Sequence, residues 1–364
     1  MLVEHEKWMK AALSLANRGL GNVAPNPAVG CLLVKDGVVV GRGWTQPGGR
    51  PHAETCALAM AGPKARGATA YITLEPCAHH GQTPPCADAL VKGGVALAVI
   101  ACTDPDNRVA GKGIALLSDS GIETKVGVLG VEAKNLNAGF FSGIERKRPF
   151  FTLKTAATLD GRTATNSGES KWLTDTEART YGHKLRATHD GILVGVNTVI
   201  SDDPSLACRI EGLRHRSPRP IILDSELRTP VGSQLIQNAR TSQPLLICED
   251  KFVGSKRGID LAAYGADLLA VHNTRDLEDV SKNLVKQGLT RILVEGGSQV
   301  MASFVKARYC DRVVAFMSGK IVGADGLASI GAIGLAKLAD APHLTLETIR
   351  KIGPDLLATY VNAE

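Results

Sequence analysis

Four residues between positions 51 and 86 have the types and the order of a hydrolytic metal site. His52 and Glu54 are separated by one residue, and Cys77 and Cys86 follow further along the chain. One imidazole and two thiolates are sufficient ligands for a catalytic zinc ion, which keeps its fourth position for water. A nearby carboxylate can transfer protons between that water and a substrate. We therefore predict that His52, Cys77 and Cys86 bind zinc and that Glu54 carries the protons.

The order of these residues is the pattern of the zinc-dependent nucleobase deaminases, in which His-x-Glu is followed by Pro-Cys and a second cysteine. Two residues usually separate the cysteines in that pattern, whereas eight separate Cys77 from Cys86 here. The intervening stretch is rich in glycine and proline, which favour a loop, and a loop lets both sulfur atoms reach one ion. A helix is predicted to begin at Cys86, after Pro85, where the helix dipole stabilises a thiolate. The remaining cysteines are expected to be packing residues: Cys31, Cys56, Cys102, Cys208, Cys248 and Cys310.

Composition limits the class of protein that can carry this site. The chain has 364 residues, which fits two domains, and its 44% hydrophobic and 21% charged residues are typical of a globular protein. No apolar run approaches the roughly 20 residues that a membrane helix needs. The N-terminal stretch is polar from Glu4 to Lys7 and does not resemble a signal peptide. Because the eight cysteines come without secretory features, we expect reduced thiols, a cytoplasmic location and no membrane partner.

The charge balance gives a weak indication of the ligand. The formal net charge of +6 favours anions, which include both nucleic acids and phosphorylated small molecules. Aromatic residues make up only 4% of the chain, and no basic stripe alternates with aromatic side chains as it does in single-strand nucleic-acid grooves. We therefore predict a small phosphorylated substrate and no nucleic-acid partner.

The first half of the chain should form a sheet with helices on both faces. The predicted helices lie at 4–18, 52–61, 86–92 and 114–120. The predicted strands lie at 29–34, 38–40, 68–74, 95–101 and 122–128. In this arrangement both metal-binding segments are junctions between a loop and a helix, and they can converge at one edge of the sheet. A charged stretch that ends in Pro149 then marks a boundary, so we predict domains at 1–148 and 149–364.

The second half alternates strands and helices throughout, as an α/β domain does. Thr174 and Glu177 have the spacing of a capping box, which predicts a helix to about residue 187. Two long stretches near the end, 312–321 and 344–361, could pair antiparallel. The other predicted strands lie at 150–159, 191–196, 220–224, 245–248, 267–271 and 291–295.

A glycine pair in this half is a candidate phosphate-binding turn. Gly296 and Gly297 follow the apolar strand 291–295 and precede a predicted helix at 300–307. Glycines let a phosphate approach the backbone, and the start of a helix offers free N–H donors. No Gly-x-Gly-x-x-Gly follows a strand and no Walker sequence is present, so an ordinary Rossmann site is not supported.

Taken together, the chain resembles a family of bifunctional riboflavin-biosynthesis enzymes, in which a zinc pyrimidine deaminase is fused to an NADPH-dependent reductase. The resemblance extends over nearly the whole chain, and the wide cysteine spacing is usual in that family. The stretches that carry it are 25–31, 51–54, 74–86, 153–162, 170–174, 195–204 and 294–297.

The resemblance implies a fold, two reactions and two cofactors. The fold would be a cytidine-deaminase-like three-layer α/β/α domain followed by a dihydrofolate-reductase-like α/β domain. The first reaction would remove the exocyclic amine of 2,5-diamino-6-ribosylamino-4(3H)-pyrimidinone 5′-phosphate, with one zinc ion per chain. The second would reduce the ribosyl group of 5-amino-6-(5-phosphoribosylamino)uracil to ribityl with NADPH. Family members also assemble as oligomers, which implies a homo-oligomer here.

The resemblance assigns further site residues, position by position. Glu54 and Lys154 would be catalytic. The substrate-binding positions would be Asn26, His79, Ser170, Arg186, Leu206, Arg209 and Glu295. The nucleotide-binding positions would be Ala156, Trp172, Thr198, Asp202, Ser225, Gly297, Ser298, Gln299, Val300, Met301, Ala302 and Ser303. From residue type alone, Arg186 would be a solvated charge and Trp172 a core residue.

Two positions depart from the family pattern. Thr45 stands where a histidine is common, and Gln82 stands where lysine or arginine is common. Both are expected near the phosphate end of the deaminase site. We predict that other basic groups contact the phosphate there instead.

Two alternative hypotheses keep the deaminase but change the second half. In one, the second half is an RNA-binding module, which predicts salt-sensitive RNA binding. In the other, it is a ligand sensor without catalytic activity. Consumption of NADPH with the deaminated substrate would separate the reductase from the sensor.

Overall fold

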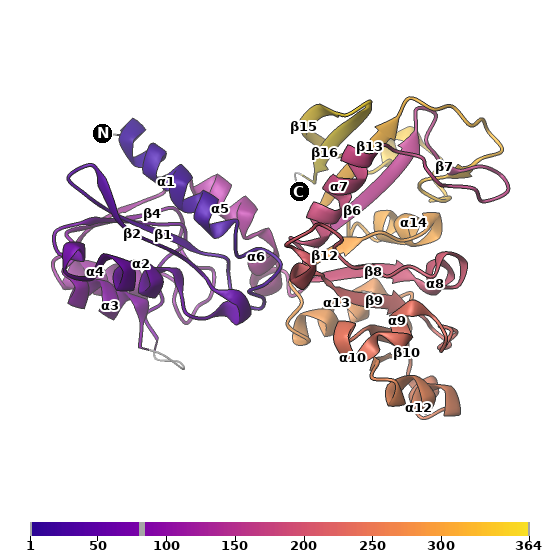
Figure 1. The fold of residues 1–364 in the computed structure, drawn as a ribbon, viewed down its shortest axis with the longest axis horizontal. Helices are drawn as coiled ribbons and strands as arrows, with labels where there is room; N and C mark the ends of the chain where they lie inside the picture. The colour runs from indigo at the N-terminus through magenta and orange to yellow at the C-terminus, as the bar shows by residue number, and fades with distance from the viewer. Residues whose placement is uncertain (1, 80–83, 363–364) are drawn as a thin grey trace. The chain divides into compact units, whose positions relative to one another are not determined.

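The computed structural model describes residues 2–79 and 84–362. The chain divides into two compact units, residues 1–147 and residues 148–364 (Figure 1). Each unit is built on its own β-sheet and has its own apolar core. Among the described residues, no helix combines the length and the apolar character that crossing a membrane would require.

The first unit is a mixed five-stranded sheet with the strand order β2-β1-β3-β4-β5. Strand β1 is antiparallel to β2 and β3, whereas β3, β4 and β5 are parallel to one another. The strands are β1 (Gly30–Lys35), β2 (Val38–Trp44), β3 (Thr69–Ile72), β4 (Leu97–Ile100) and β5 (Glu123–Val126). The carboxyl ends of β3 and β4 point to one edge, because these strands are parallel.

Helices cover both faces of this sheet, which confirms the predicted layering (Figure 1). Helices α2, α3 and α4 lie on one face, and α1 and α5 lie on the other. The helices are α1 (Leu2–Ala16), α2 (Ala53–Ala61), α3 (Cys86–Gly93), α4 (Lys112–Asp119), α5 (Gly130–Leu136) and α6 (Ala138–Glu145). The short helices α5 and α6 were not predicted from the sequence.

Two glycines in β2 set the position of α2, the helix that begins at the metal site. A Cβ atom on Gly43 would lie 2.1 Å from the carbonyl oxygen of Ala53, and one on Gly41 would lie 2.3 Å from that of Ala57. Real Cβ atoms do not come so close to a carbonyl oxygen, so any other residue would push the helix away. The glycines therefore hold the first turn of α2 against the sheet.

The second unit is a nine-stranded sheet with the order β11-β10-β9-β8-β12-β6-β13-β16-β15. The strands from β11 to β13 are parallel, and the last two are antiparallel additions at one edge. They are β6 (Phe150–Thr158), β8 (Gly191–Gly195), β9 (Arg219–Leu223), β10 (Leu245–Glu249), β11 (Asp267–Val271), β12 (Arg291–Val294), β13 (Arg312–Ser318), β15 (Thr345–Ile352) and β16 (Asp355–Val361). Strands β7 (Arg162–Ala164) and β14 (Leu327–Ala328) form a separate pair.

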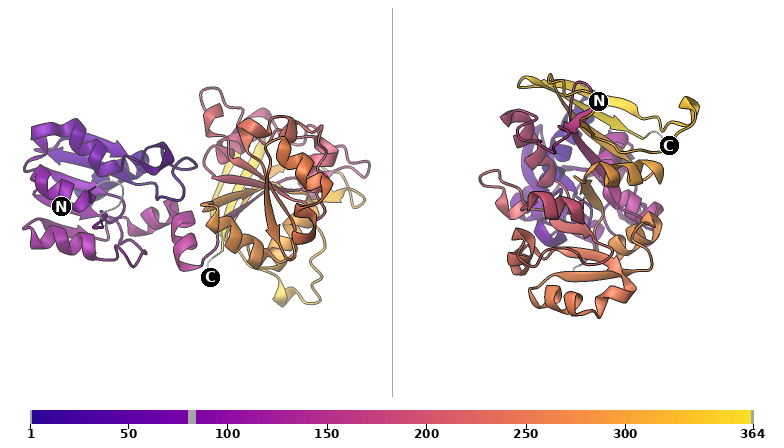
Figure 2. Two further views of the ribbon diagram at one scale, coloured as in Figure 1. Left: turned by 90° about the horizontal axis from the view of Figure 1, so that it is seen from below. Right: turned by 90° about the vertical axis from the view of Figure 1, so that its right-hand side faces the viewer.

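Helices lie on both sides of this twisted sheet, as Figure 2 shows. Side chains of α13 and α14 belong to one core cluster, and those of α8, α9 and α12 belong to another. A smaller cluster packs α7 against β13 and β16. The helices are α7 (Thr176–Arg186), α8 (Val196–Asp202), α9 (Gln234–Gln237), α10 (Ala239–Ser242), α11 (Asp250–Val253), α12 (Lys256–Ala263), α13 (Leu277–Lys286) and α14 (Ser298–Lys306).

Two local predictions in this unit are corrected by the structure. The capping box at Thr174 and Glu177 is wrong, because Asp175 is the N-cap of α7 and makes no side-chain cap bond. Its backbone N–H instead donates to Asp355 Oδ2 at 2.7 Å, so a distant strand supports this end of the helix. The stretch 344–361 is a hairpin of β15 and β16 rather than one strand, although β16 does pair antiparallel with β13 as expected.

Candidate active sites

The three predicted metal ligands lie together in the first unit. His52 is the N-cap of α2, Cys77 lies in the loop after β3, and Cys86 is the first residue of α3. His52 Nδ1 is 3.3 Å from Cys86 Sγ and 3.7 Å from Cys77 Sγ, and the backbone N–H of Cys86 donates to Cys77 Sγ at 3.3 Å. All the ligand atoms are within 4.8 Å of one another. One imidazole nitrogen and two sulfur atoms at this spacing suit a zinc ion.

The titratable groups of this cluster shift one another's pKa values. A hydrogen bond from the Cys86 thiol lowers the pKa of Cys77 to about 4, and the same contact raises the pKa of Cys86. The thiolate form binds zinc, so Cys77 is predisposed to act as a ligand. Glu54 lies in the first turn of α2 with 4% of its surface exposed. Burial, followed by the charge of Cys77, raises the pKa of Glu54 to about 7, which suits a group that must both accept and release a proton.

Glu75 anchors the loop that carries Cys77, a role that the sequence analysis did not identify. Its side chain is 3% exposed and accepts hydrogen bonds from four backbone N–H groups at 2.9–3.3 Å. The donors are Asp104, Gly111, Gly113 and Ile114. One carboxylate thus ties the metal-binding loop to the loop 104–111 and to the first turn of α4. At Gly113 a Cβ would lie 2.0 Å from the carbonyl oxygen of Pro76, so the two segments are in close contact.

The two predicted substrate residues of the first unit lie in loops beside the cluster. Asn26 packs against Gly49, where a Cβ would lie 2.1 Å from Asn26 Nδ2. Gly49 belongs to the short turn that leads to His52. His79 is exposed, and its charge helps Arg108 to lower the pKa of Asp106, which places His79 near the loop 104–108.

The two departures from the family pattern have different outcomes. Thr45 is 2% exposed, and its hydroxyl donates to the carbonyl oxygen of Pro27 and accepts from the backbone N–H of Val29. It is therefore committed to local backbone contacts rather than presented to a ligand. Gln82 lies outside the described residues, so the prediction for it stays a prediction.

A charged cluster lies in the second unit, where β6 and β12 run side by side. Arg186 donates to both carboxylate oxygens of Glu295, at 3.0 and 2.9 Å, and Lys154 Nζ is 3.9 Å from Glu295 Oε2. Burial opposes ionisation of Glu295, yet Arg186 and Lys154 lower its pKa to about 2. These residues and Arg209 line a cavity of about 170 Å³. Arg186 is thus not the solvated charge that its residue type alone suggested.

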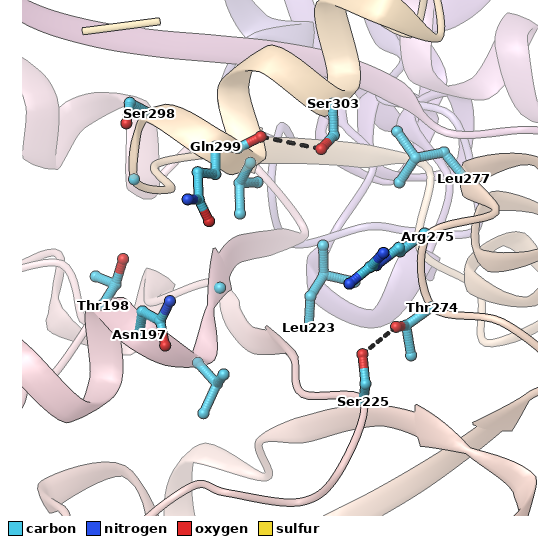
Figure 3. A pocket seen from close by; sticks show the side chains of 14 residues that line it. Asn197, Thr198, Leu223, Ser225, Thr274, Arg275, Leu277, Ser298, Gln299 and Ser303 are labelled. Carbon is cyan, nitrogen blue, oxygen red and sulfur yellow. Dashed lines mark hydrogen bonds between the residues drawn. The ribbon is translucent and has the colours of Figure 1, made fainter. Parts of the chain in front are cut away.

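A larger cavity of about 400 Å³ lies where β8, β9 and α14 meet (Figure 3). Gln299 and Ser303 of α14 line one part, and Thr198, Ser225 and Arg275 line others. The hydroxyl groups of Ser225 and Thr274 are hydrogen-bonded to each other. The predicted nucleotide-binding residues that line this cavity are Thr198, Ser225, Gly297, Ser298, Gln299, Val300 and Ser303.

The other predicted residues of the second unit do not line either cavity. Met301 and Ala302 lie on the buried side of α14 and pack into the core. Trp172 is 63% exposed, with the Arg179 guanidinium 4.6 Å from its ring centre, so it is not a core residue either. The remainder of this group comprises Ala156 on β6, Ser170 in an exposed loop, Asp202 at the end of α8 and buried Leu206.

Basic residues that the sequence analysis missed line a third cavity of about 600 Å³. This cavity shares Val196, Leu223, Ser225 and Arg275 with the second one. It also contains Arg228 and His272, together with the carboxylates of Glu226 and Glu249. Arg228 donates to Asn197 Oδ1 at 2.7 Å. The carboxyl ends of four neighbouring strands, β8 to β11, and the segments that follow them converge here, so no single stretch of sequence could have revealed the group.

Comparison with known proteins gives a consistent result for both units. A family model described as the cytidine and deoxycytidylate deaminase zinc-binding region matches residues 2–102, and one described as the RibD C-terminal domain matches residues 149–358. The riboflavin biosynthesis protein RibD of Aquifex aeolicus is 41% identical over 361 residues, which cover 99% of each chain. The solved structure of Acinetobacter baumannii RibD is similar at 35% identity, with a TM-score of 0.90 and 100% coverage of both chains.

A third relative carries a name that describes two activities. It is the Thermotoga maritima diaminohydroxyphosphoribosylaminopyrimidine deaminase/5-amino-6-(5-phosphoribosylamino)uracil reductase. Its structure is similar at 33% identity with a TM-score of 0.87, over 100% of this chain and 99% of that one.

The folds and the sites together define a zinc-binding deaminase domain joined to a reductase domain. The predicted α/β fold class is thereby confirmed. The likeness over the whole chain then shows that the protein belongs to the RibD family of riboflavin biosynthesis enzymes. It is a bifunctional deaminase and reductase, which is both a hydrolase and an oxidoreductase. The comparisons therefore favour the reductase over the RNA-binding and sensor hypotheses, and the reductase domain implies a nucleotide cofactor.

Proposed function

We propose that the first unit hydrolyses the exocyclic amine of 2,5-diamino-6-ribosylamino-4(3H)-pyrimidinone 5′-phosphate with one zinc ion per chain. The observation that carries this proposal is the cluster of His52, Cys77 and Cys86 beside the buried carboxylate of Glu54. The name of the Thermotoga maritima relative supports the choice of substrate. The division of the chain between residues 147 and 148 supports a deaminase domain at 1–148 and a reductase domain at 149–364.

In the deaminase reaction the protein's own groups place the substrate and move the protons. A bound zinc ion would supply a Lewis acid that makes a water molecule acidic enough to ionise near neutral pH. Glu54 accepts one proton from that water and passes it to the ring nitrogen as the hydroxide adds to the amine-bearing carbon. It then moves the second proton, from the added hydroxyl group, to the amine, so that the C–N bond breaks and ammonia leaves. Asn26, held against Gly49, hydrogen-bonds the pyrimidine, and His79 contacts the substrate near its phosphate.

Substitution of Glu54 tests this division of roles. We expect Glu54→Ala to keep one zinc ion per chain, because the three ligands remain, while ammonia release falls by about 10²–10⁴-fold. Glu132→Ala, which removes an exposed carboxylate from α5, is the matched control and should leave both quantities unchanged. Normal ammonia release by Glu54→Ala would show that the proton-transfer role is wrong.

For the second unit, the proposed reaction is reduction of the ribosyl group of 5-amino-6-(5-phosphoribosylamino)uracil to ribityl. NADPH would supply the hydride from the 400 Å³ cavity, where the free N–H groups at the start of α14 suit a phosphate. The substrate would bind in the cavity of about 170 Å³, against Lys154, Arg209 and Glu295. Lys154 faces the reacting sugar in this proposal, so Lys154→Ala should abolish NADPH oxidation and leave ammonia release intact.

The third cavity supports NADPH rather than NADH as the reductant. NADPH differs from NADH by a phosphate on the adenosine ribose, and arginine is well suited to bind phosphate. Arg228, His272 and Arg275 lie in the cavity that adjoins the proposed nucleotide site. We expect Arg228→Ala to raise the KM for NADPH about tenfold or more and to leave the KM for NADH unchanged. Equal effects on both nucleotides would contradict the assignment of this cavity.

A further inference from the structure

We infer that His183 is a positioning residue of the reductase: its ring holds the Arg209 guanidinium in the substrate cavity, where Arg209 binds an anionic group such as the substrate phosphate. The inference rests on the proposed reductase function. His183 lies on α7, three residues before Arg186, and lines the same cavity as Arg209 and Glu295.

The contact between the two side chains defines the protonation state of the imidazole. Arg209 Nε donates to His183 Nε2 at 3.1 Å. Because a guanidinium can only donate, Nε2 must be the unprotonated nitrogen, and the single proton of a neutral ring lies on Nδ1. The backbone N–H of Arg209 also points at Nδ1, at 3.4 Å. A neutral ring accepts at one nitrogen only, so this longer contact is not a hydrogen bond in the tautomer that accepts from Arg209 Nε.

The surroundings of His183 keep the ring in this neutral, accepting form. Burial and the positive charges of Arg186 and Arg209 lower the pKa of His183 to about 4. The charge of Glu295 and a hydrogen bond to the backbone of Ala207 oppose this shift but do not overcome it. Near neutral pH the ring therefore remains an acceptor for Arg209.

Arg209 is the cation of this cavity that is available to an anion. Arg186 is held by both oxygens of Glu295, and Lys154 also faces Glu295. Within residues 2–79 and 84–362, no carboxylate forms an ion pair with Arg209. Since His183 occupies Nε, the two terminal nitrogens of the guanidinium remain to bind a phosphate through two parallel hydrogen bonds.

The test is a set of reductase assays on the full chain with the phosphorylated aminouracil substrate and NADPH. We expect His183→Leu to raise the KM for the substrate about tenfold, with kcat and the KM for NADPH changed less than about twofold, because a charged hydrogen bond is lost. His183→Gln, whose amide oxygen can accept from Arg209, should restore most of the loss. Lys184→Ala, at the exposed neighbouring position on α7, is the control and should resemble the wild type.

A double substitution separates positioning from a general structural role. Arg209→Ala alone should raise the KM for the substrate, and adding His183→Leu to it should cause no further increase, because His183 acts through Arg209. An unchanged KM for NADPH, whose proposed cavity lies in the same unit, reports that the second unit is folded. If His183→Leu folds poorly, His183→Ala takes its place both alone and in the double substitution. Additive increases in the substrate KM would overturn the inference, and so would an equal loss of NADPH affinity. A wild-type chain that does not oxidise NADPH would instead refute the proposed reductase.

Discussion

Gly182 occupies the interior of α7, where glycine is less favourable than alanine by about 1 kcal/mol. A Cβ atom added there would meet no atom within 4 Å, so the packing of the protein does not require glycine. The residue lines the cavity that holds Arg186 and Glu295. The space beside it is therefore available to a substrate.

We predict that Gly182→Ala stabilises the second unit by about 0.5–1 kcal/mol and yet raises the KM for the aminouracil substrate several-fold. The gain comes from helix propensity, and the loss comes from a methyl group in the substrate space. Urea unfolding and steady-state kinetics measure the two effects. A more stable variant with an unchanged KM would show that the substrate does not occupy this space.

How far single site residues could be predicted depends on how local their signal is. His52, Glu54, Cys77 and Cys86 lie in one short stretch whose order is itself diagnostic, and the structure brings their side chains together. Glu75 lies in the same stretch, but its role depends on backbone donors about 30–40 residues away, which no local pattern reveals. The roles of Arg228 and His183 depend likewise on contacts between distant segments.

At the scale of elements, Glu75 connects the metal-binding loop to α4. We predict that Glu75→Gln destabilises the first unit by about 2 kcal/mol or more, because the amide cannot accept from all four buried N–H groups. Ammonia release should fall with it, since the Cys77 loop loses its support, while NADPH oxidation should remain normal. Thermal unfolding and the two activity assays measure these effects, with Glu132→Gln as the exposed control. Unchanged stability would show that the contact is dispensable.

The pH dependence of the second unit should reflect the junction of α7 and β6. His189 is buried between them, with Nδ1 2.7 Å from the carbonyl oxygen of Leu185 and Nε2 3.0 Å from the Thr152 hydroxyl. Burial and the charge of Arg291 lower the pKa of His189 from 6.5 to about 3. At a pH between these two pKa values, His189 binds a proton in the unfolded chain but not in the folded chain.

Stability should therefore fall as the pH drops from about 6.5 towards 3, by up to about 1.4 kcal/mol per pH unit from this residue. His189→Gln removes the titrating group, so its unfolding free energy should depend less steeply on pH over that range. Urea unfolding of the full chain, with limited proteolysis of residues 148–364 as the readout, measures both slopes. Identical slopes for the variant and the wild type would contradict the assignment.

Helices and strands were predicted well where a local sequence pattern specifies them. They were predicted less well where contacts between distant residues set their ends. The parallel strands of the second unit are mainly apolar runs, most of them buried, and each one was found within a few residues. The N-terminus of α7 was misassigned, because its support comes from Asp355, 180 residues away, rather than from a capping box. The hairpin of β15 and β16 was taken for one strand, because the tight turn at Gly353 is bordered by strand-like sequence on both sides.

At the scale of the whole molecule, the two chemistries belong to two units with separate cores. The metal cluster and Glu54 are contained in the first, and the charged cluster of Lys154, Arg186 and Glu295 is contained in the second. The type and the order of the two domains could be predicted from the sequence, because each carries its own motifs. The three cavities of the second unit could not, because each is lined by residues from several separate segments of the chain.

The most direct test of the central claim is to remove the metal with a chelator and then restore it, with both activities measured on the full chain. We expect one zinc ion per chain to be lost and ammonia release from the diaminopyrimidine phosphate to stop. NADPH oxidation should continue when the deaminated substrate is supplied, and zinc alone should restore ammonia release. Ammonia release that persists after the zinc has been removed would contradict the account.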